Sequence, residues 1–370
     1  MTHPVEALAA GLFGRLAARP GNLAFSPYSV ALALAMVQHG AVGETRDELL
    51  AVLGASDPAR LDRDLADLAR RLREPGDDVV LAAANALFGQ EGTSFAQPFL
   101  DALTHGYGTA VHTVDYAADA GSARRDINAW TSEQTRARIT EIVPQGALGS
   151  ATRLVLVNAL YLKAAWERPF ERTRTADAAF LLDGGATVTV PMMRPRLAPT
   201  HLGRGDGWLA VPLPYAGGRV VMTVVLPDAG RRAEVEEAVA GGGLPAMLAS
   251  PEPTEVDLRL PRWTVRSQVP LKEILAELGL RQVFSGAADL SAMTTDERVA
   301  VDEVLHEAFV SVDEDGTEAA AATAVVVRAT SLVPPRPRTP VVVDRPFLFV
   351  VHDARLRAPL FVGRVSDPTT

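Results

Sequence analysis

The chain alternates between segments with helical and with strand-like hydrophobic patterns. Apolar residues at helical spacing predict helices, whereas short apolar runs bounded by turn residues predict buried strands. The predicted helices span 5–18, 27–37, 46–53, 57–72, 122–139 and 271–278. The predicted strands span 79–88, 154–162, 186–190, 209–213, 220–226, 255–260, 299–312, 341–343, 347–352 and 360–365. The chain is therefore expected to mix α and β structure.

Two of these segments carry the clearest signals. Ser26 can cap a helix whose first position is Pro27, and the run that follows is apolar nearly all round, so we expect this helix to be buried. Residues 154–162 are apolar on both faces of a strand, which predicts a central strand in a sheet that is covered on both sides.

The stretch from Val312 to Arg328 fits more than one local structure. It starts acidic, contains Gly316 and runs through alanines, so 318–324 could form a helix. As a strand, it would present one face of small or β-branched uncharged residues: Thr317, Ala319, Ala321, Thr323, Val325 and Val327. The prolines at 334, 335 and 337 would end any strand. Taken alone, the stretch is most simply an exposed connector.

Composition narrows the classes of protein. A length of 370 residues with 48% hydrophobic residues allows a large core, in several domains or in one mixed domain. A net charge of −9 offers no basic surface for nucleic acid or anionic lipid. Without cysteine there are no disulfides and no thiolate chemistry. No signal peptide and no apolar run of membrane-spanning length is visible, so we expect no membrane partner, and the compartment is left open.

Motifs of enzymes and cofactor sites are incomplete in this chain. His306 and Glu307 begin like a zinc-binding helix motif, but Val310 occupies the place of the second histidine. A calcium loop that starts at Ser311 would end on Ala322 instead of glutamate. No phosphate-binding loop and no nucleophile elbow is present. We therefore predict neither an enzyme nor a cofactor or metal site.

A set of short motifs, in a fixed order along nearly the whole chain, resembles the serpin family of serine protease inhibitors. These motifs are 22–29 (NLAFSPYS), 84–88 (ANALF), 156–163 (LVNALYLK) with Trp166 and Pro169-Phe170, 213–215 (LPY), 288–291 (ADLS), His306, Glu314, 316–319 (GTEA), 344–347 (DRPF) and 361–365 (FVGRV). The absence of cysteine, signal and long extensions makes the chain look like a compact prokaryotic member, for which the keywords bacterial and thermostable are expectations.

The resemblance implies an α+β serpin fold with three β-sheets, eight to nine helices and an exposed reactive-centre loop. We expect a single serpin domain over 1–370, with the loop at about 316–337. In inhibitory serpins a hinge glutamate lies sixteen residues before the residue whose carbonyl is attacked. Glu314 matches it, which predicts cleavage between Thr330 and Ser331. The hinge would comprise Glu314, Gly316, Thr317, Glu318, Ala319, Ala320, Ala321 and Ala322.

The resemblance also implies two internal sites that control opening of the sheet. Trp166 would pack at the breach, where the loop first enters the sheet. A polar cluster called the shutter would lie beneath the point of opening, and it comprises Ser26, Ser29, Asn85, Asn158 and His306. Without the resemblance, His306 would be interpreted as an ordinary buried histidine and Trp166 as a large core residue.

The implied function is suicide inhibition: the protease is acylated at Thr330, and the loop inserts as a central strand. Absence of bulky, charged or proline residues at 317, 319, 321 and 323 favours an inhibitor. The alternative is a non-inhibitory serpin that acts as a binding, chaperone-like or storage protein. Thr330 suits elastase-like or subtilisin-like proteases, whereas cleavage at Leu332 would suit a chymotrypsin-like enzyme and cleavage at Arg328 a trypsin-like one. We expect a monomer without a cofactor.

Overall fold

The computed structural model describes residues 4–72, 80–195, 198–249, 251–294, 298–317 and 338–370. Within these ranges it contains nine α-helices and three β-sheets, which agrees with the expected α+β fold. The helices are α1 (Pro4–Leu16), α2 (Pro27–Gln38), α3 (Gly43–Val52), α4 (Pro58–Leu72), α5 (Gln97–Ala102), α6 (Tyr116–Gln134), α7 (Arg232–Ala240), α8 (Leu244–Met247) and α9 (Lys272–Glu277). Three single turns accompany them: η1 (Leu103–Tyr107), η2 (Arg172–Arg174) and η3 (Gln282–Phe284).

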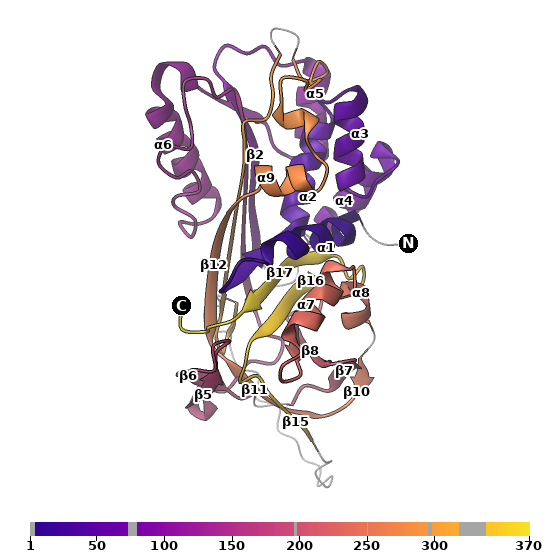
Figure 1. Ribbon diagram of the computed structural model, residues 1–370, viewed down its shortest axis with the longest axis vertical. Coiled ribbons are helices and arrows are strands. Elements are labelled where there is room, and N and C mark those ends of the chain that lie inside the picture. The colour runs from indigo at the N-terminus through magenta and orange to yellow at the C-terminus, as the bar shows by residue number, and fades with distance from the viewer. Residues whose placement is uncertain (1–3, 73–79, 196–197, 250, 295–297, 318–337) are drawn as a thin grey trace.

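A six-stranded sheet forms the long axis of the molecule. Its strands run in the order β12 (Trp263–Pro270), β13 (Glu303–Val312), β14 (Gly316–Thr317), β4 (Leu154–Ala165), β2 (Val80–Gln90) and β3 (Val111–Val114). Helix α6 covers one face of this sheet, while α1, α2, α3 and α4 lie on the other side (Figure 1). Strand β4 lies inside this sheet, which is covered on both faces. Its residues are therefore buried and mostly apolar on both sides, as predicted.

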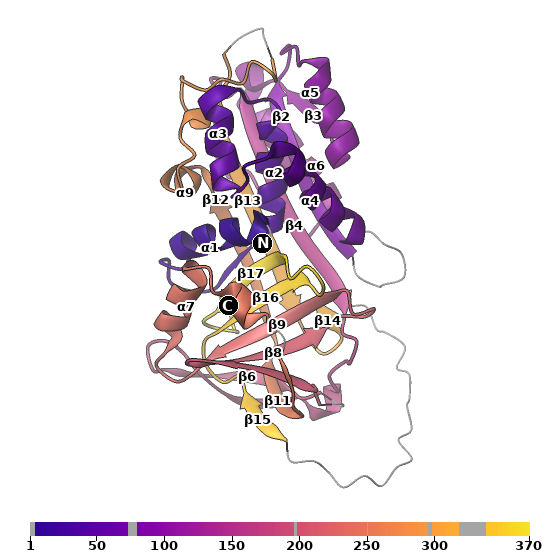
Figure 2. The same cartoon turned by 90° about the vertical axis from the view of Figure 1, so that its right-hand side faces the viewer.

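Two further sheets complete the fold. The seven-stranded sheet has the order β1 (Leu23–Phe25), β17 (Pro359–Val365), β16 (Phe347–Asp353), β9 (Val220–Pro227), β8 (Trp208–Pro214), β7 (His201–Gly205) and β10 (Glu252–Pro253). The four-stranded sheet has the order β15 (Thr339–Val342), β11 (Val256–Pro261), β6 (Thr187–Met193) and β5 (Ala176–Leu181). Figure 2 shows these sheets in the half of the molecule opposite to helices α3 and α5.

The apolar residues divide into two clusters on the two faces of the long sheet. The larger cluster fills the space beneath α2 and extends through the seven-stranded sheet. The smaller cluster lies under α6 and includes Ile127, Val155, Val157 and Leu305. Alternate residues of β4 and β13 therefore point into different cores. A strand that lay between them would likewise place its alternate side chains in the two cores.

Helix α2 begins as the sequence indicates. The Ser26 side chain caps the helix by accepting a hydrogen bond from the Ser29 amide, and Pro27 occupies its first turn. Eleven of its twelve residues are buried. The cap therefore fixes Ser26 and Ser29 at the point where the helix meets the long sheet.

Some predicted boundaries were wrong. The helix expected over 122–139 starts at Tyr116 and ends at Gln134, because Arg136 and Ala137 adopt positive φ angles of 53° and 59°. The strand expected from Val299 begins only at Glu303. Six strands were not predicted at all, namely β1, β3, β5, β7, β10 and β12, and neither were helices α5, α7 and α8.

Candidate functional site

Gly316 and Thr317, two of the predicted hinge residues, form the short strand β14 between β13 and β4. Thr317 is paired with Val312 of β13 on one side and with Ala164 of β4 on the other, and Gly316 is paired with Ala165. Further along, β4 and β13 pair directly with each other in parallel, from Val155–Glu303 to Tyr161–Phe309. At one end of the sheet β14 therefore separates β13 from β4, whereas from 155 to 161 and from 303 to 309 the two strands are direct neighbours.

Glycine is required at the first position of β14. Gly316 has a φ angle of 153°, and a Cβ atom there would lie 2.0 Å from the backbone oxygen of Ala164. Any other residue would collide with β4 and adopt a backbone conformation that L-amino acids rarely take. Gly316 thus lets the chain turn into the gap between the two strands.

The Thr317 side chain is completely buried and contacts Tyr215. Its Oγ1 lies 2.7 Å from the Tyr215 hydroxyl, and the Tyr215 ring stacks on Trp166 with centroids 4.5 Å apart and an interplanar angle of 7°. Trp166 Nε1 donates to the backbone oxygen of Asp313 at 2.9 Å, and its backbone amide donates to that of Asp315. The proposed breach residue therefore holds the segment that precedes β14.

Glu314 is buried and paired on the same segment. Arg262, which directly precedes β12, donates to both carboxylate oxygens at 2.5–2.9 Å, and the Thr175 hydroxyl donates at 2.5 Å. Burial opposes ionisation of Glu314, but these hydrogen bonds outweigh it, so that its pKa lies below the usual value. The charged carboxylate therefore ties the segment before β14 to Arg262 and Thr175.

The five proposed shutter residues form one hydrogen-bonded cluster. Asn158 donates to Ser29 Oγ at 2.7 Å and to Asn85 Oδ1 at 2.6 Å, and the Ser29 hydroxyl donates to Asn85 Oδ1 at 2.7 Å. The Ser26 amide donates to His306 Nε2 at 3.0 Å, which makes Nε2 an acceptor. The proton on His306 therefore sits on Nδ1 and is donated to Asn158 Oδ1.

Complete burial keeps the His306 imidazole neutral. Desolvation lowers its pKa to about 3, despite the hydrogen bond to Asn158. Asn158 and His306 are direct partners in the β4–β13 pairing. Their side-chain hydrogen bond therefore joins the two strands at the level of the cluster.

The remaining predicted site residues lie outside the described residues: Glu318, Ala319, Ala320, Ala321, Ala322, Thr330 and Ser331. In the part of the chain that the structure describes, no three histidine or acidic side chains gather as metal ligands would. None of the helices described is both long and apolar enough to cross a membrane.

Sequence reasoning missed three partners of the hinge: Arg262, Thr175 and Tyr215. Tyr215 belongs to a recognised motif, but nothing in the motif indicated a contact with Thr317. Arg262 directly precedes β12, a strand that was not predicted, so its approach to Glu314 had no basis in the sequence. These contacts arise between segments far apart along the chain.

Comparisons with known proteins agree with this architecture. The family model described as "Serpin (serine protease inhibitor)" matches residues 4–368. An uncharacterized serpin-like protein of Thermococcus kodakarensis is 34% identical over 373 residues, covering 100% of this chain and 86% of that protein. The leukocyte elastase inhibitor of Bos taurus is 34% identical over 359 residues, covering 94% of this chain and 93% of that protein.

A solved structure supports the same assignment. Human thyroxine-binding globulin in complex with thyroxine superposes with a TM-score of 0.89 at 28% identity, covering 100% of this chain and 98% of that one. The chain belongs to the serpin family. Because its relatives include a protein named as an elastase inhibitor and another named for binding thyroxine, family membership alone does not choose between inhibition and binding.

Proposed function

We propose that this serpin is a suicide-substrate inhibitor of serine proteases, cleaved between Thr330 and Ser331. The observation that carries the proposal is β14: the hinge already begins an antiparallel strand in the gap between β4 and β13. A segment that starts in register between two strands can extend as a strand once its far end is released. The residues after Thr317 would then continue this strand between β4 and β13.

Continuing the β14 register sets the position of each loop residue in the inserted state. The sixth residue after Thr317 is Thr323, and it would face the sixth residue before Ala164, which is Asn158, and the sixth before Val312, which is His306. Thr323 would thus enter where Asn158 and His306 now bond to each other. Its hydroxyl can donate and accept, so buried polar groups would keep partners as the strands separate.

The two faces of the loop suit the two cores. Thr317 points into the larger core, so Ala319, Ala321 and Thr323 would follow on that face, where space between packed side chains is small. On the α6 face, Glu318 would lie level with Lys163 of β4, where the opposite charges attract. Neither face of this segment presents a residue that opposes insertion.

The chemistry begins as ordinary proteolysis. The serine Oγ of the protease attacks the Thr330 carbonyl carbon, the bond to the Ser331 nitrogen breaks, and the new Ser331 amine takes a proton from the catalytic base. The protease remains as an ester on Thr330. Insertion of about fourteen residues at about 3.3 Å each would then carry it roughly 45 Å along the sheet. Displacement before water hydrolyses the ester is what traps the protease.

The proposed target is a serine protease with a small specificity pocket. Thr330 preceded by Ala329 fits elastase-like or subtilisin-like enzymes, and the similarity to a leukocyte elastase inhibitor supports that class. Cleavage after Leu332 would instead select a chymotrypsin-like enzyme, and cleavage after Arg328 a trypsin-like one. We further propose that residues 1–370 act as one domain and as a monomer.

Incubation with elastase, subtilisin, chymotrypsin and trypsin tests the proposal. We expect an SDS-stable complex with one of the first two enzymes and a released C-terminal peptide whose mass corresponds to a start at Ser331. Catalytically inactive elastase, in which the nucleophilic serine is replaced by alanine, is the control and should give no such complex. Cleavage by all four enzymes without any complex would favour the non-inhibitory alternative.

A further inference from the structure

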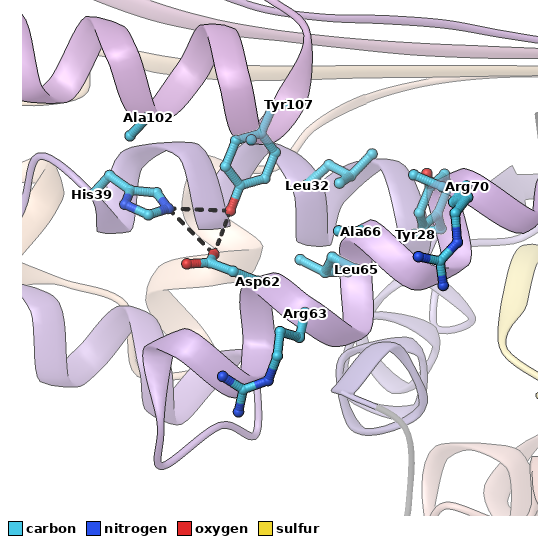
Figure 3. Close-up of a pocket in the computed structure, with 12 residues that line it drawn as sticks. Tyr28, Leu32, His39, Asp62, Arg63, Leu65, Ala66, Arg70, Ala102 and Tyr107 are labelled. Carbon is cyan, nitrogen blue, oxygen red and sulfur yellow. Dashed lines mark hydrogen bonds and ion pairs between the residues drawn. The ribbon is translucent and has the colours of Figure 1, made fainter.

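A cavity of about 730 Å³ lies between helices α2 and α4 and the turn η1. Its walls are mainly apolar, with Leu32 from α2 facing Leu65, Ala66 and Ala69 from α4. Figure 3 shows Leu32, Leu65 and Ala66 between the two ends of the cavity. The volume and the apolar lining are typical of sites that hold small organic molecules.

One end of this cavity is polar. The Tyr107 hydroxyl donates to Asp62 Oδ1 at 2.7 Å, and His39 Nε2 lies 3.2 Å from the same oxygen (Figure 3). Asp62 Oδ2 takes no hydrogen bond from the residues that the structure describes, and the side chain is 33% exposed. Burial opposes ionisation of Asp62, but hydrogen bonds from His39 and Tyr107 outweigh it and lower its pKa. The ionised Asp62 carboxylate at this end can therefore accept a further hydrogen bond at Oδ2.

The charges at the rim are already compensated. Arg70 lies 2.7 Å from Asp67, and Arg63 lies 3.8 Å from Asp57. An anionic ligand would gain little from these exposed pairs and would be repelled by Asp62. The polar end needs a hydrogen-bond donor, while the rim offers no excess of either charge.

We propose that this cavity binds an uncharged amphiphile with a hydroxyl head, such as a medium-chain alcohol. The hydroxyl would donate to Asp62 Oδ2, and the hydrocarbon body would lie along α4 towards Tyr28 and Arg70, which stand at the other end (Figure 3). Asp62 and Arg70 are eight residues apart on one helix, or about 12 Å. An extended hydrocarbon chain of about ten carbons has a similar length and would lie against the apolar side chains of α4.

Calorimetric titration of the whole protein with decan-1-ol, decyl methyl ether and decanoate tests the head group. The alcohol should bind saturably at one site per chain. The ether lacks the donor, and decanoate carries a negative charge, so each should bind about tenfold more weakly. Absence of saturable binding of decan-1-ol would overturn the proposal, as would decanoate or the ether binding as tightly as the alcohol.

A matched pair of substitutions on α4 tests the location. Ala69→Trp fills the cavity and should abolish binding of decan-1-ol, whereas Ala59→Trp, at an exposed position of the same helix that does not line the cavity, should leave it unchanged. Circular dichroism checks that both variants fold. Undiminished binding by a folded Ala69→Trp variant would overturn the proposed location. The comparison of the three head groups uses the unmodified protein, so it does not depend on whether this variant folds.

Discussion

At the scale of single residues, Thr317 is the side chain whose size matters most for the proposed insertion. It is completely buried, and its hydroxyl meets that of Tyr215. Thr317→Arg would place a long charged side chain in this apolar space, so we expect loop entry to stall and the protein to become a substrate. The measure is the amount of SDS-stable complex formed with the target protease, which should fall at least about tenfold.

The conservative variant Thr317→Ser is the control for this prediction. It keeps a small side chain with a hydroxyl group that can reach Tyr215, so it should inhibit like the unmodified protein. Equal inhibition by the arginine and serine variants would contradict the proposed path of insertion.

His306 should make the stability of the fold depend on pH. Its pKa is about 3 in the folded protein and about 6.5 in an unfolded chain. As the pH falls below 6.5, the unfolded chain binds a proton that the folded protein does not, so stability is lost, at up to about 1.4 kcal/mol per pH unit, until about pH 3. Above pH 6.5, His306 is neutral in both states, so it causes no loss of stability there.

Melting temperatures between pH 7 and pH 4 test this dependence. His306→Gln should show a shallower fall than the unmodified protein, while His105→Gln, at an exposed position, should keep the original slope. Buried His352, whose pKa desolvation lowers to about 4, adds a fall of the same sign in all three proteins. Parallel curves for all three proteins would show that His306 does not titrate as described.

At the scale of elements, β14 depends on a single glycine. Gly316→Ala would bring a Cβ atom against the Ala164 carbonyl, so we expect β14 to leave the gap between β4 and β13. Hydrogen–deuterium exchange of a peptide that spans 313–317 should then become faster, and inhibition should slow. Gly286→Ala is the control, because Gly286 has open space around its Cα and no unusual φ angle. Unchanged exchange in the Gly316→Ala variant would argue against the described pairing.

Strand β12 shows where sequence patterns failed at this scale. Its residues alternate between buried positions such as Trp263 and Val265 and exposed ones such as Thr264 and Arg266. This alternation in the edge strand was not recognised in the sequence, although the alternating segment 255–260 was predicted as a strand. Strand β12 pairs along its whole length with β13 and brings Arg262 next to Glu314. Because this strand was not predicted, the contact between Arg262 and Glu314 was not predicted either.

At the scale of the whole molecule, cleavage should stabilise the protein. Strands β4 and β13 pair directly with each other, and a cut at the proposed Thr330–Ser331 bond would free the loop to add a strand between them and bury its small face. We expect the melting temperature to rise by at least about 10 °C after cleavage, equivalent to several kcal/mol. Thr317→Arg cleaved by the same protease should rise far less. A cleaved protein with an unchanged melting temperature would rule out insertion.

The sequence by itself determined the family, because the order of the motifs is written along the chain. It also determined the mixed fold and most of the regular elements, because hydrophobic periodicity is a local property of each segment. It also singled out Ser26, Ser29, Asn85, Asn158 and His306 through the resemblance. It could not determine the hydrogen bonds among them, since these join α2, β2, β4 and β13.

Tertiary structure alone decided the state of the sheet and the partners of the hinge. The stretch after Val312 fits a helix, a strand or a connector by local propensity, and only the gap between β4 and β13 selects a strand for Gly316 and Thr317. Likewise, only the packing of α2, α4 and η1 brings His39, Asp62 and Tyr107 to one cavity. Strand pairing and burial depend on residues distant in sequence, which no local pattern specifies.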